Sequence, residues 1–172
     1  MANFHVDKEI LEKYLPAHTE IDSWNGKYYI SLVGFLFKDT RVKGIQFPFH
    51  GDFEEVNLRF YVKHKEHHQW KRGVVFIKEI VPKKLITLIA NTLYNENYET
   101  RKMSHTFSMD SKIRVEYKWK VRDSWNFVKA IAQIEKNKLV TGSEEEFITE
   151  HYWGCFTSYS VVRVLSILLY PQ

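Results

Sequence analysis

Residues 53–62 constrain the fold of this chain more than any other segment, because their polar and apolar side chains alternate. The apolar members of the row are Val56, Leu58, Phe60 and Val62, and the polar members are Glu55, Asn57, Arg59 and Tyr61. A β-strand presents successive side chains to opposite faces, so the row predicts a strand with one apolar and one polar face. In one interpretation the polar face lines a ligand cavity. In the other it faces water, as in most half-buried strands.

Length and composition predict one soluble domain over residues 1–172, since a chain of this size can bury a sizeable core. An aromatic content of 16% favours a β-rich architecture. The net charge is +4, but Lys and Arg are spread among 21 acidic residues, which argues against a nucleic-acid surface. No apolar run reaches the ~18 residues of a membrane helix. The single Cys155 and a start unlike a signal peptide predict a cytoplasmic protein.

The pattern along the chain predicts strands over residues 27–38, 53–63, 70–80, 98–109, 112–121 and 126–134. Helices are predicted over residues 8–15 with Asp7 as N-cap, over residues 83–94 after Pro82, and from Ser143 to about residue 152. Ser143 and Glu146 have the spacing of a capping box. Antiparallel strands in succession with only a few helices indicate a mainly β, α+β fold with a closed or nearly closed barrel.

Seven short blocks of this sequence resemble a known family. They are YLPAHTE (14–20), YISLVGF (29–35), RVKG (41–44), PFH (48–50), FEEVNLRFYV (53–62), GVVF (73–76) and EFITEHY (146–152). The chain is similar over about residues 1–154 to the YqjF-like family of uncharacterised bacterial proteins, in the acetoacetate decarboxylase-like superfamily. The resemblance implies an antiparallel, cone-shaped β-barrel with peripheral helices and an interior cavity, here incomplete at both ends. It implies no particular activity, because the family has no agreed one.

Decarboxylases of that superfamily act through a Schiff-base lysine, whose pKa is lowered by a neighbouring positive charge and apolar walls. Their lysine pair follows a helix that resembles residues 83–94. Residues 95–100 of this chain contain no lysine, and Lys102 lies beyond that segment. The acidic residue of the enzymes loosely matches the segment 53–55. The resemblance therefore implies a retained carboxylate without the nucleophile.

Six residues are candidate ligand-binding residues: Glu55, Asn57, Arg59, Tyr61, Lys78 and Tyr98. The Arg59 guanidinium suits a small, anionic organic ligand through a bidentate contact. The alternative for the polar row is an internal Glu–Arg network that fills the barrel. Lys78 lies within an apolar run and is a substitute amine if it points inward, or an ordinary outward lysine if it does not.

Other residues that often carry chemistry have structural interpretations in this sequence. His64, His67 and His68 fall in a predicted hairpin turn, where solvation is favoured over a metal site. His151 ends a predicted helix, where an imidazole caps the helix dipole. Cys155 is expected in the core. We therefore expect no metal and no cofactor.

Two classes of function remain open from the sequence: a small-molecule-binding barrel without turnover, and an enzyme, a lyase or other, acting on a small oxo acid or related carbonyl compound. A third possibility is a filled barrel that acts only through partners. The oligomeric state is not indicated by the sequence.

The segment 155–172 is an atypical tail, in which Arg163 is the sole charged residue. It is expected either to form a buried final strand, or to replace lost strands in a truncated or frame-shifted family member, exposing a strand edge.

Overall fold

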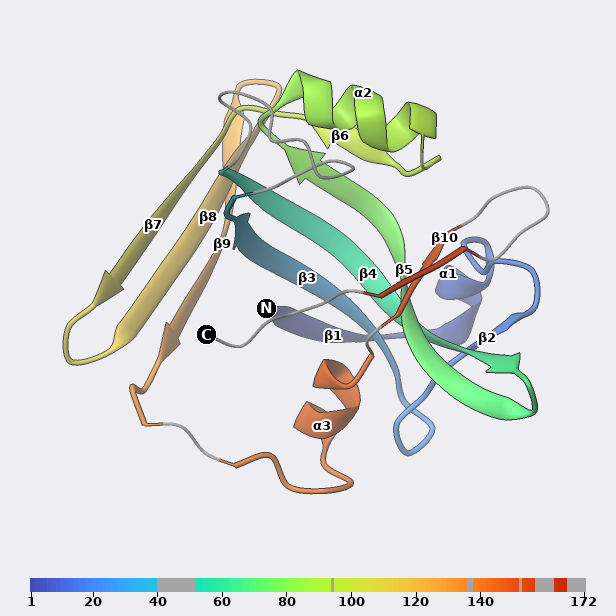
Figure 1. Cartoon of the computed structure of the whole chain (residues 1–172). Helices are drawn as coiled ribbons and strands as arrows, with labels where there is room; N and C mark the ends of the chain where they lie inside the picture. Colours follow the sequence, from blue (N-terminus) through green and yellow to red (C-terminus); the bar gives the residue numbers. More distant parts are fainter. Residues whose placement is uncertain (40–51, 94, 136–137, 152, 157–162, 167–172) are drawn as a thin grey trace. The chain divides into compact units, whose positions relative to one another are not determined.

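The computed structural model describes residues 1–39, 52–93, 95–135, 138–151, 153–156 and 163–166, drawn in colour in Figure 1. Residues 40–51 of the predicted loop 39–52 and much of the tail lie outside the described residues. Eight described strands form a larger sheet: β1 (Ala2–Val6), β2 (Thr19–Ile21), β3 (Tyr28–Phe37), β4 (Phe53–Glu66), β5 (Gln69–Val81), β6 (Tyr98–Thr100), β10 (Trp153–Phe156) and β11 (Arg163–Ser166). A smaller sheet contains β7 (Met103–Met109), β8 (Ile113–Val121) and β9 (Ser124–Ala132). The described helices are α1 (Lys8–Glu12), α2 (Lys84–Leu93) and α3 (Glu144–Thr149), so the mainly β, α+β prediction is confirmed.

The larger sheet has the strand order β1-β3-β4-β5-β10-β11, with β2 paired to β4 and β6 paired to β5. Its described path has two ends, β1 and β11, so these residues do not form the expected closed barrel. The expectation of purely antiparallel pairing is also wrong, because β5 runs parallel to both β6 and β10. The parallel direction of β6 arises from the crossover from β5 through α2, which returns the chain in the same direction.

The predicted strand over residues 98–109 is two strands in two sheets. β6 ends at Thr100 and β7 begins at Met103. β6 pairs with β5, whereas β7 pairs antiparallel with β8, which pairs with β9. Residues 99–102 at the break are all polar, and the apolar parity changes from position 98 to positions 103, 107 and 109, a signal that the prediction overlooked.

The described contacts divide the chain into two compact units. The first consists of Met1–Ala2, Leu32–Asn57 and Lys78–Lys136, and the second of Asn3–Ser31, Leu58–Ile77 and Asn137–Gln172. Strands β1, β3, β4 and β5 each contribute residues to both units. The expectation of one domain over residues 1–172 stays a prediction, and we describe each unit by itself.

In the first unit, Gly34 of β3 provides space for the ring of Tyr117 on β8. A Cβ atom on Gly34 would lie 2.6 Å from Cδ2 of that ring. Tyr117 is buried at 9% exposure, whereas Phe107 and Phe127 of the same sheet are each 63% exposed. The glycine therefore permits a close packing contact that no other residue could share.

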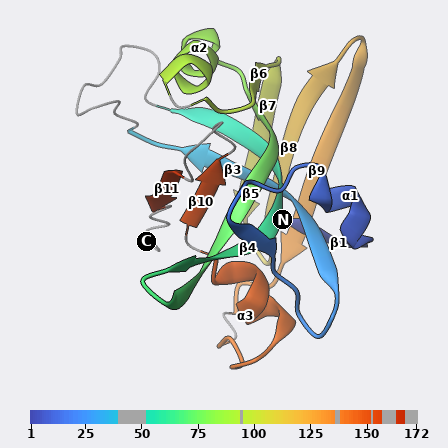
Figure 2. The ribbon, with the colours of Figure 1, turned by 90° about the vertical axis from the view of Figure 1, so that its right-hand side faces the viewer.

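In the second unit, one core cluster consists of Leu11, Ile21, Phe60, Val62 and Val75. A second consists of Tyr29, Tyr61, Val74, Phe147 and Ile148. Strands β10 and β11 pair antiparallel, as Figure 2 shows, and β10 pairs with residues 73–75 of β5. The described part of the tail is therefore sheet, and the burial of its side chains stays a prediction.

Helix α3 begins as predicted, because the Ser143 side chain accepts a hydrogen bond from the Glu146 amide at 3.2 Å. The Glu146 carboxylate accepts from the Gly142 amide, so the return bond of the box reaches one residue further back. Helix α1 is shorter than the predicted 8–15, and Asp7 sits at its N-cap without a side-chain hydrogen bond.

The β4–β5 hairpin turns later than predicted. His67 and His68 have φ values of 46° and 64°, the left-handed backbone of a tight two-residue turn. Strand β4 therefore extends to Glu66, and His64 lies within it opposite Thr19 of β2. His64 is only 6% exposed, so its placement in a solvated turn was wrong.

Candidate functional site

Five side chains of the first unit form what we call the carboxyl cluster: Glu55 and Asn57 on β4, Glu79 on β5, Glu96, and Tyr98 on β6. Glu55 and Asn57 are each 1% exposed and Glu79 is 3% exposed. The parallel pairing of β5 with β6 aligns Glu79 with Tyr98. Carboxyl groups distant in sequence thus share one buried environment.

Glu55 accepts hydrogen bonds from Tyr98 and Asn57. The Tyr98 hydroxyl donates to its Oε2 at 2.8 Å, and the Asn57 amide nitrogen donates to its Oε1 at 3.0 Å. Two buried oxygens of the cluster, Asn57 Oδ1 and Glu79 Oε2, have no hydrogen-bond partner among the described residues. Such atoms are uncommon in folded proteins, and each needs a physical explanation.

The cluster retains protons at neutral pH. Burial raises the pKa of Glu79 to about 9, and the charges of Glu55 and Glu96 act in the same direction, whereas a hydrogen bond with Tyr98 opposes them. Burial, followed by the charge of Glu55, raises the pKa of Glu96 to about 7. Burial and the same carboxylates raise the pKa of Tyr98, which stays a neutral donor. The site can therefore exchange protons near physiological pH.

Lys78 on β5 lies beside Asn97 and Glu99. Its Nζ lies 3.0 Å from Glu99 Oε2 and donates to Asn97 Oδ1 at 3.5 Å. Arg101 also pairs with Glu99. The hydrogen bond from Lys78, which outweighs the opposing effect of burial, lowers the pKa of Glu99. The Lys78 amine is thus an ion-pair donor, and its side chain is 37% exposed.

The two remaining candidates belong to the second unit. Tyr61 is fully buried, its hydroxyl lies 2.6 Å from Ser31 Oγ, and its ring packs against Phe147 and His151. Tyr61 therefore has a core position. Arg59 is half-buried, and its Nε has no hydrogen-bond partner among the described residues.

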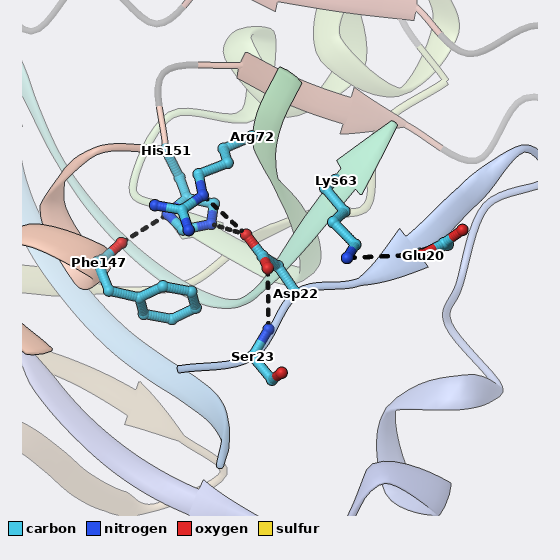
Figure 3. A network of polar contacts seen from close by, with 7 residues as sticks. All are labelled: Glu20, Asp22, Ser23, Lys63, Arg72, Phe147 and His151. Carbon is cyan, nitrogen blue, oxygen red and sulfur yellow. Dashed lines mark hydrogen bonds and ion pairs between the residues drawn. The ribbon is translucent and has the colours of Figure 1, made fainter. Parts of the chain in front are cut away.

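A second polar network lies within the second unit and is drawn in Figure 3. His151 Nε2 lies 3.2 Å from Asp22 Oδ2, and the same oxygen lies 3.1 Å from Arg72 Nε. His151 Nδ1 lies 2.7 Å from the carbonyl oxygen of Phe147. Each imidazole nitrogen therefore lies within hydrogen-bond distance of an oxygen that can accept.

This network ties α3 to the sheet. Burial would raise the pKa of Asp22, but the hydrogen bond and charge of His151, the charge of Arg72 and the Ser23 amide together lower it. The predicted helix-end role of His151 is confirmed by its bond to Phe147. Its partner Asp22 was missed, because 129 residues separate the two and no local pattern links them. We assign this network a structural role.

Sequence reasoning also missed Glu79 and Glu96. Glu79 had a signal, because residues 74–81 are apolar at both parities apart from positions 78 and 79. A run of that kind indicates a strand covered on both faces, which leaves no solvent-exposed side for a carboxylate. Glu96 had none, since it follows a helix in a polar segment.

Two classes of feature are not found in the described part of the chain. No group of three or more His, Cys, Asp and Glu side chains there is arranged to hold a metal ion. No helix there combines the length and the apolar character needed to cross a membrane.

The fold and the carboxyl cluster define a mainly β protein with buried acid groups around a tyrosine. A family model described as "Uncharacterized conserved protein", DUF2071, matches residues 1–167, and the chain belongs to that family. It is 32% identical over 98 residues to the uncharacterized protein YqjF of Bacillus subtilis (strain 168). The match covers 56% of this chain and 39% of that relative, so it spans well under half of the relative's length.

Proposed function

We propose that this protein binds a small organic molecule at the carboxyl cluster without forming a Schiff base. The observation that carries the proposal is the pair of buried oxygens, Asn57 Oδ1 and Glu79 Oε2, that lack partners among the described residues. A buried polar atom left without a hydrogen bond costs about 1–3 kcal/mol. A ligand that donates to both oxygens would recover that free energy, whereas a purely structural cluster would retain the cost.

The proposed setting of this site is an acetoacetate decarboxylase-like barrel with an interior cavity, in the cytoplasm of a bacterium. The resemblance of residues 14–62 and 146–152 to YqjF-like proteins supports the scaffold, and a single cysteine in the chain supports a reducing compartment. Of the six residues predicted from the sequence, we retain Glu55, Asn57 and Tyr98 as ligand contacts.

A second candidate function is an enzyme on the same scaffold that acts on a small oxo acid or related carbonyl compound. It is favoured by Glu96, whose pKa is raised to about 7 by burial and by Glu55, because a general acid or base works best near the operating pH. In this case Glu96 moves the proton and Glu55 positions the substrate.

The proposal is tested by a thermal-shift screen of small metabolites against the wild-type chain. A ligand at 100 times its Kd adds about 2.7 kcal/mol to the stability of the folded state. Glu79→Gln and Asn57→Ala should abolish the shift produced by a true ligand. The exposed Glu135→Gln, a matched change outside the cluster, should leave it intact. A screen in which every shift survives both cluster variants would refute the proposal.

Borohydride trapping separates the Schiff-base alternative from both functions. The wild-type chain is reduced in the presence of small oxo acids and digested for peptide mass spectrometry. We expect no adduct, because Lys78 donates to Glu99 and Asn97. A reduced adduct mapped to Lys78 or Lys102 would restore the enzyme mechanism of the superfamily.

A further inference from the structure

We infer that the ligand of the carboxyl cluster is a small organic cation, an amine in its ammonium form, and that its binding expels protons from the cluster. This inference rests on the proposed function and adds the chemical class of the ligand. It departs from the anionic ligand that the sequence suggested, because that expectation depended on Arg59, which lies in the second unit.

The first argument concerns charge. Three carboxyl groups of the first unit, Glu55, Glu79 and Glu96, act on one another's ionisation. Among the described residues, no side-chain cation contributes to the pKa shifts of Glu79 and Glu96, which are raised by burial and by other carboxylates. The nearby cations, Lys78 and Arg101, both pair with Glu99. A negatively charged ligand would add a further like charge to a buried acidic site, whereas an ammonium group would supply an opposite charge.

The second argument concerns hydrogen bonds. Asn57 Oδ1 is an amide oxygen, which can only accept, and it is buried without a partner among the described residues. Glu79 Oε2 also accepts once its carboxyl group is ionised. An ammonium group has up to three N–H donors and no acceptor, which matches this set of oxygens. A carboxylate ligand has no donor and would leave Asn57 Oδ1 unsatisfied.

The third argument is the link between binding and protonation. With pKa values raised to about 9 and about 7, Glu79 and Glu96 hold protons that an adjacent cation displaces. Cation binding is therefore tighter at pH 8 than at pH 6, while an alkylammonium group remains charged at both. The affinity of a neutral ligand is not expected to change with pH in this way.

The test uses three probes of equal chain length: n-butylammonium, butanamide and butyrate. Dissociation constants are measured by NMR titration of the full chain at pH 6 and pH 8 and at constant ionic strength. We expect n-butylammonium to bind most tightly of the three, and at least about ten-fold more tightly at pH 8 than at pH 6. Paired calorimetric titrations in buffers of different ionisation enthalpy should show proton release.

Substitutions within the carboxyl cluster test whether n-butylammonium binds there. Glu79→Gln mimics the protonated carboxyl group and should fold normally, but it should lose most of the pH dependence, keeping the part due to Glu96, and weaken n-butylammonium binding by about ten-fold or more. Tyr98→Phe removes a donor to Glu55 and provides a second test in the same cluster. Glu135→Gln, an exposed carboxyl group elsewhere in the first unit, should change nothing.

Three results would overturn the inference. n-Butylammonium binding that persists in Glu79→Gln, or that does not depend on pH, would place the cation elsewhere. Butyrate or butanamide binding that depends on Glu79 would make the ligand class wrong and leave the proposed function standing. Absence of binding by every probe at about 50 mM would reject small amines, and the metabolite screen would then judge the proposed function separately.

Discussion

The raised pKa of Glu79 makes the stability of the folded chain depend on pH. It lies at 3% exposure on β5, and burial, followed by the charges of Glu55 and Glu96, raises its pKa from 4.5 to about 9. A group with a raised folded-state pKa contributes its full stability below the unfolded pKa, and that contribution is lost as pH rises toward the folded pKa. The raised pKa of Glu96 also makes the folded chain less stable as pH rises, but over a narrower pH range.

We therefore predict that the free energy of unfolding falls between pH 5 and pH 8, by about 4 kcal/mol from Glu79 alone. Glu79→Gln should remove most of this slope and should be more stable than the wild type at pH 8. Urea unfolding at several pH values measures both effects. A wild-type profile that is flat from pH 5 to pH 8 would show that the carboxyl cluster is not desolvated.

The pKa of Asp22 is shifted in the opposite direction to that of Glu79. The net effect of its surroundings is a lowered pKa, because the bonds and charges of His151, Arg72 and Ser23 exceed the effect of burial. Its contribution is therefore present above the unfolded pKa of 3.8 and is lost as pH falls through the folded value.

Asp22→Asn should destabilise the chain at pH 6 by about 1–3 kcal/mol, since it leaves His151 buried beside a neutral amide. As pH falls below 3.8 and the Asp22 carboxyl group of the wild type takes up a proton, the difference from the wild type should shrink. Asp123→Asn, whose side chain is fully exposed, is the control and should have little effect. Equal stability of Asp22→Asn and wild type at pH 6 would contradict a structural role for the network.

At the scale of elements, the approach of β3 to β8 depends on the missing side chain of Gly34. Gly34→Ala should cost about 1–3 kcal/mol, because the new Cβ would meet the Tyr117 ring at 2.6 Å. Tyr117→Leu should relieve part of that cost, and a double-mutant cycle by chemical unfolding measures the coupling. Additive effects of the two changes would show that the ring does not limit this position.

Strands and helices could be predicted from the sequence where a local pattern determined them. The full set of residues in the carboxyl cluster could not. The alternation in residues 53–62 predicted β4, but it could not show that both of its faces are covered, with Val56 and Asn57 each 1% exposed. The capping box located the start of α3. The parallel pairing of β6, which aligns Glu79 with Tyr98, depends on how a helix crosses over the sheet, and neighbouring residues do not encode that.

At the scale of the whole molecule, four of the described strands contain residues of both compact units. A strand cannot unfold in one unit without disturbing its continuation, so we predict one cooperative unfolding transition. Glu79→Gln in the first unit and Asp22→Asn in the second should each shift the whole transition, followed by tryptophan fluorescence and by circular dichroism. Two separable transitions, each sensitive to only one variant, would show that the units fold independently.

The crossover from β5 through α2 to β6 also has a consequence for the order of folding. Lys78 and Asn97, which meet across it, are 19 residues apart, and Glu55 and Tyr98 are 43 apart, whereas His151 and Asp22 are 129 apart. Closing a short loop costs less chain entropy than closing a long one. We expect pulse-labelled hydrogen exchange during refolding to protect the amides of residues 79–81 before that of Asp22. The contacts of the carboxyl cluster would then form before the contacts that hold α3 to the sheet.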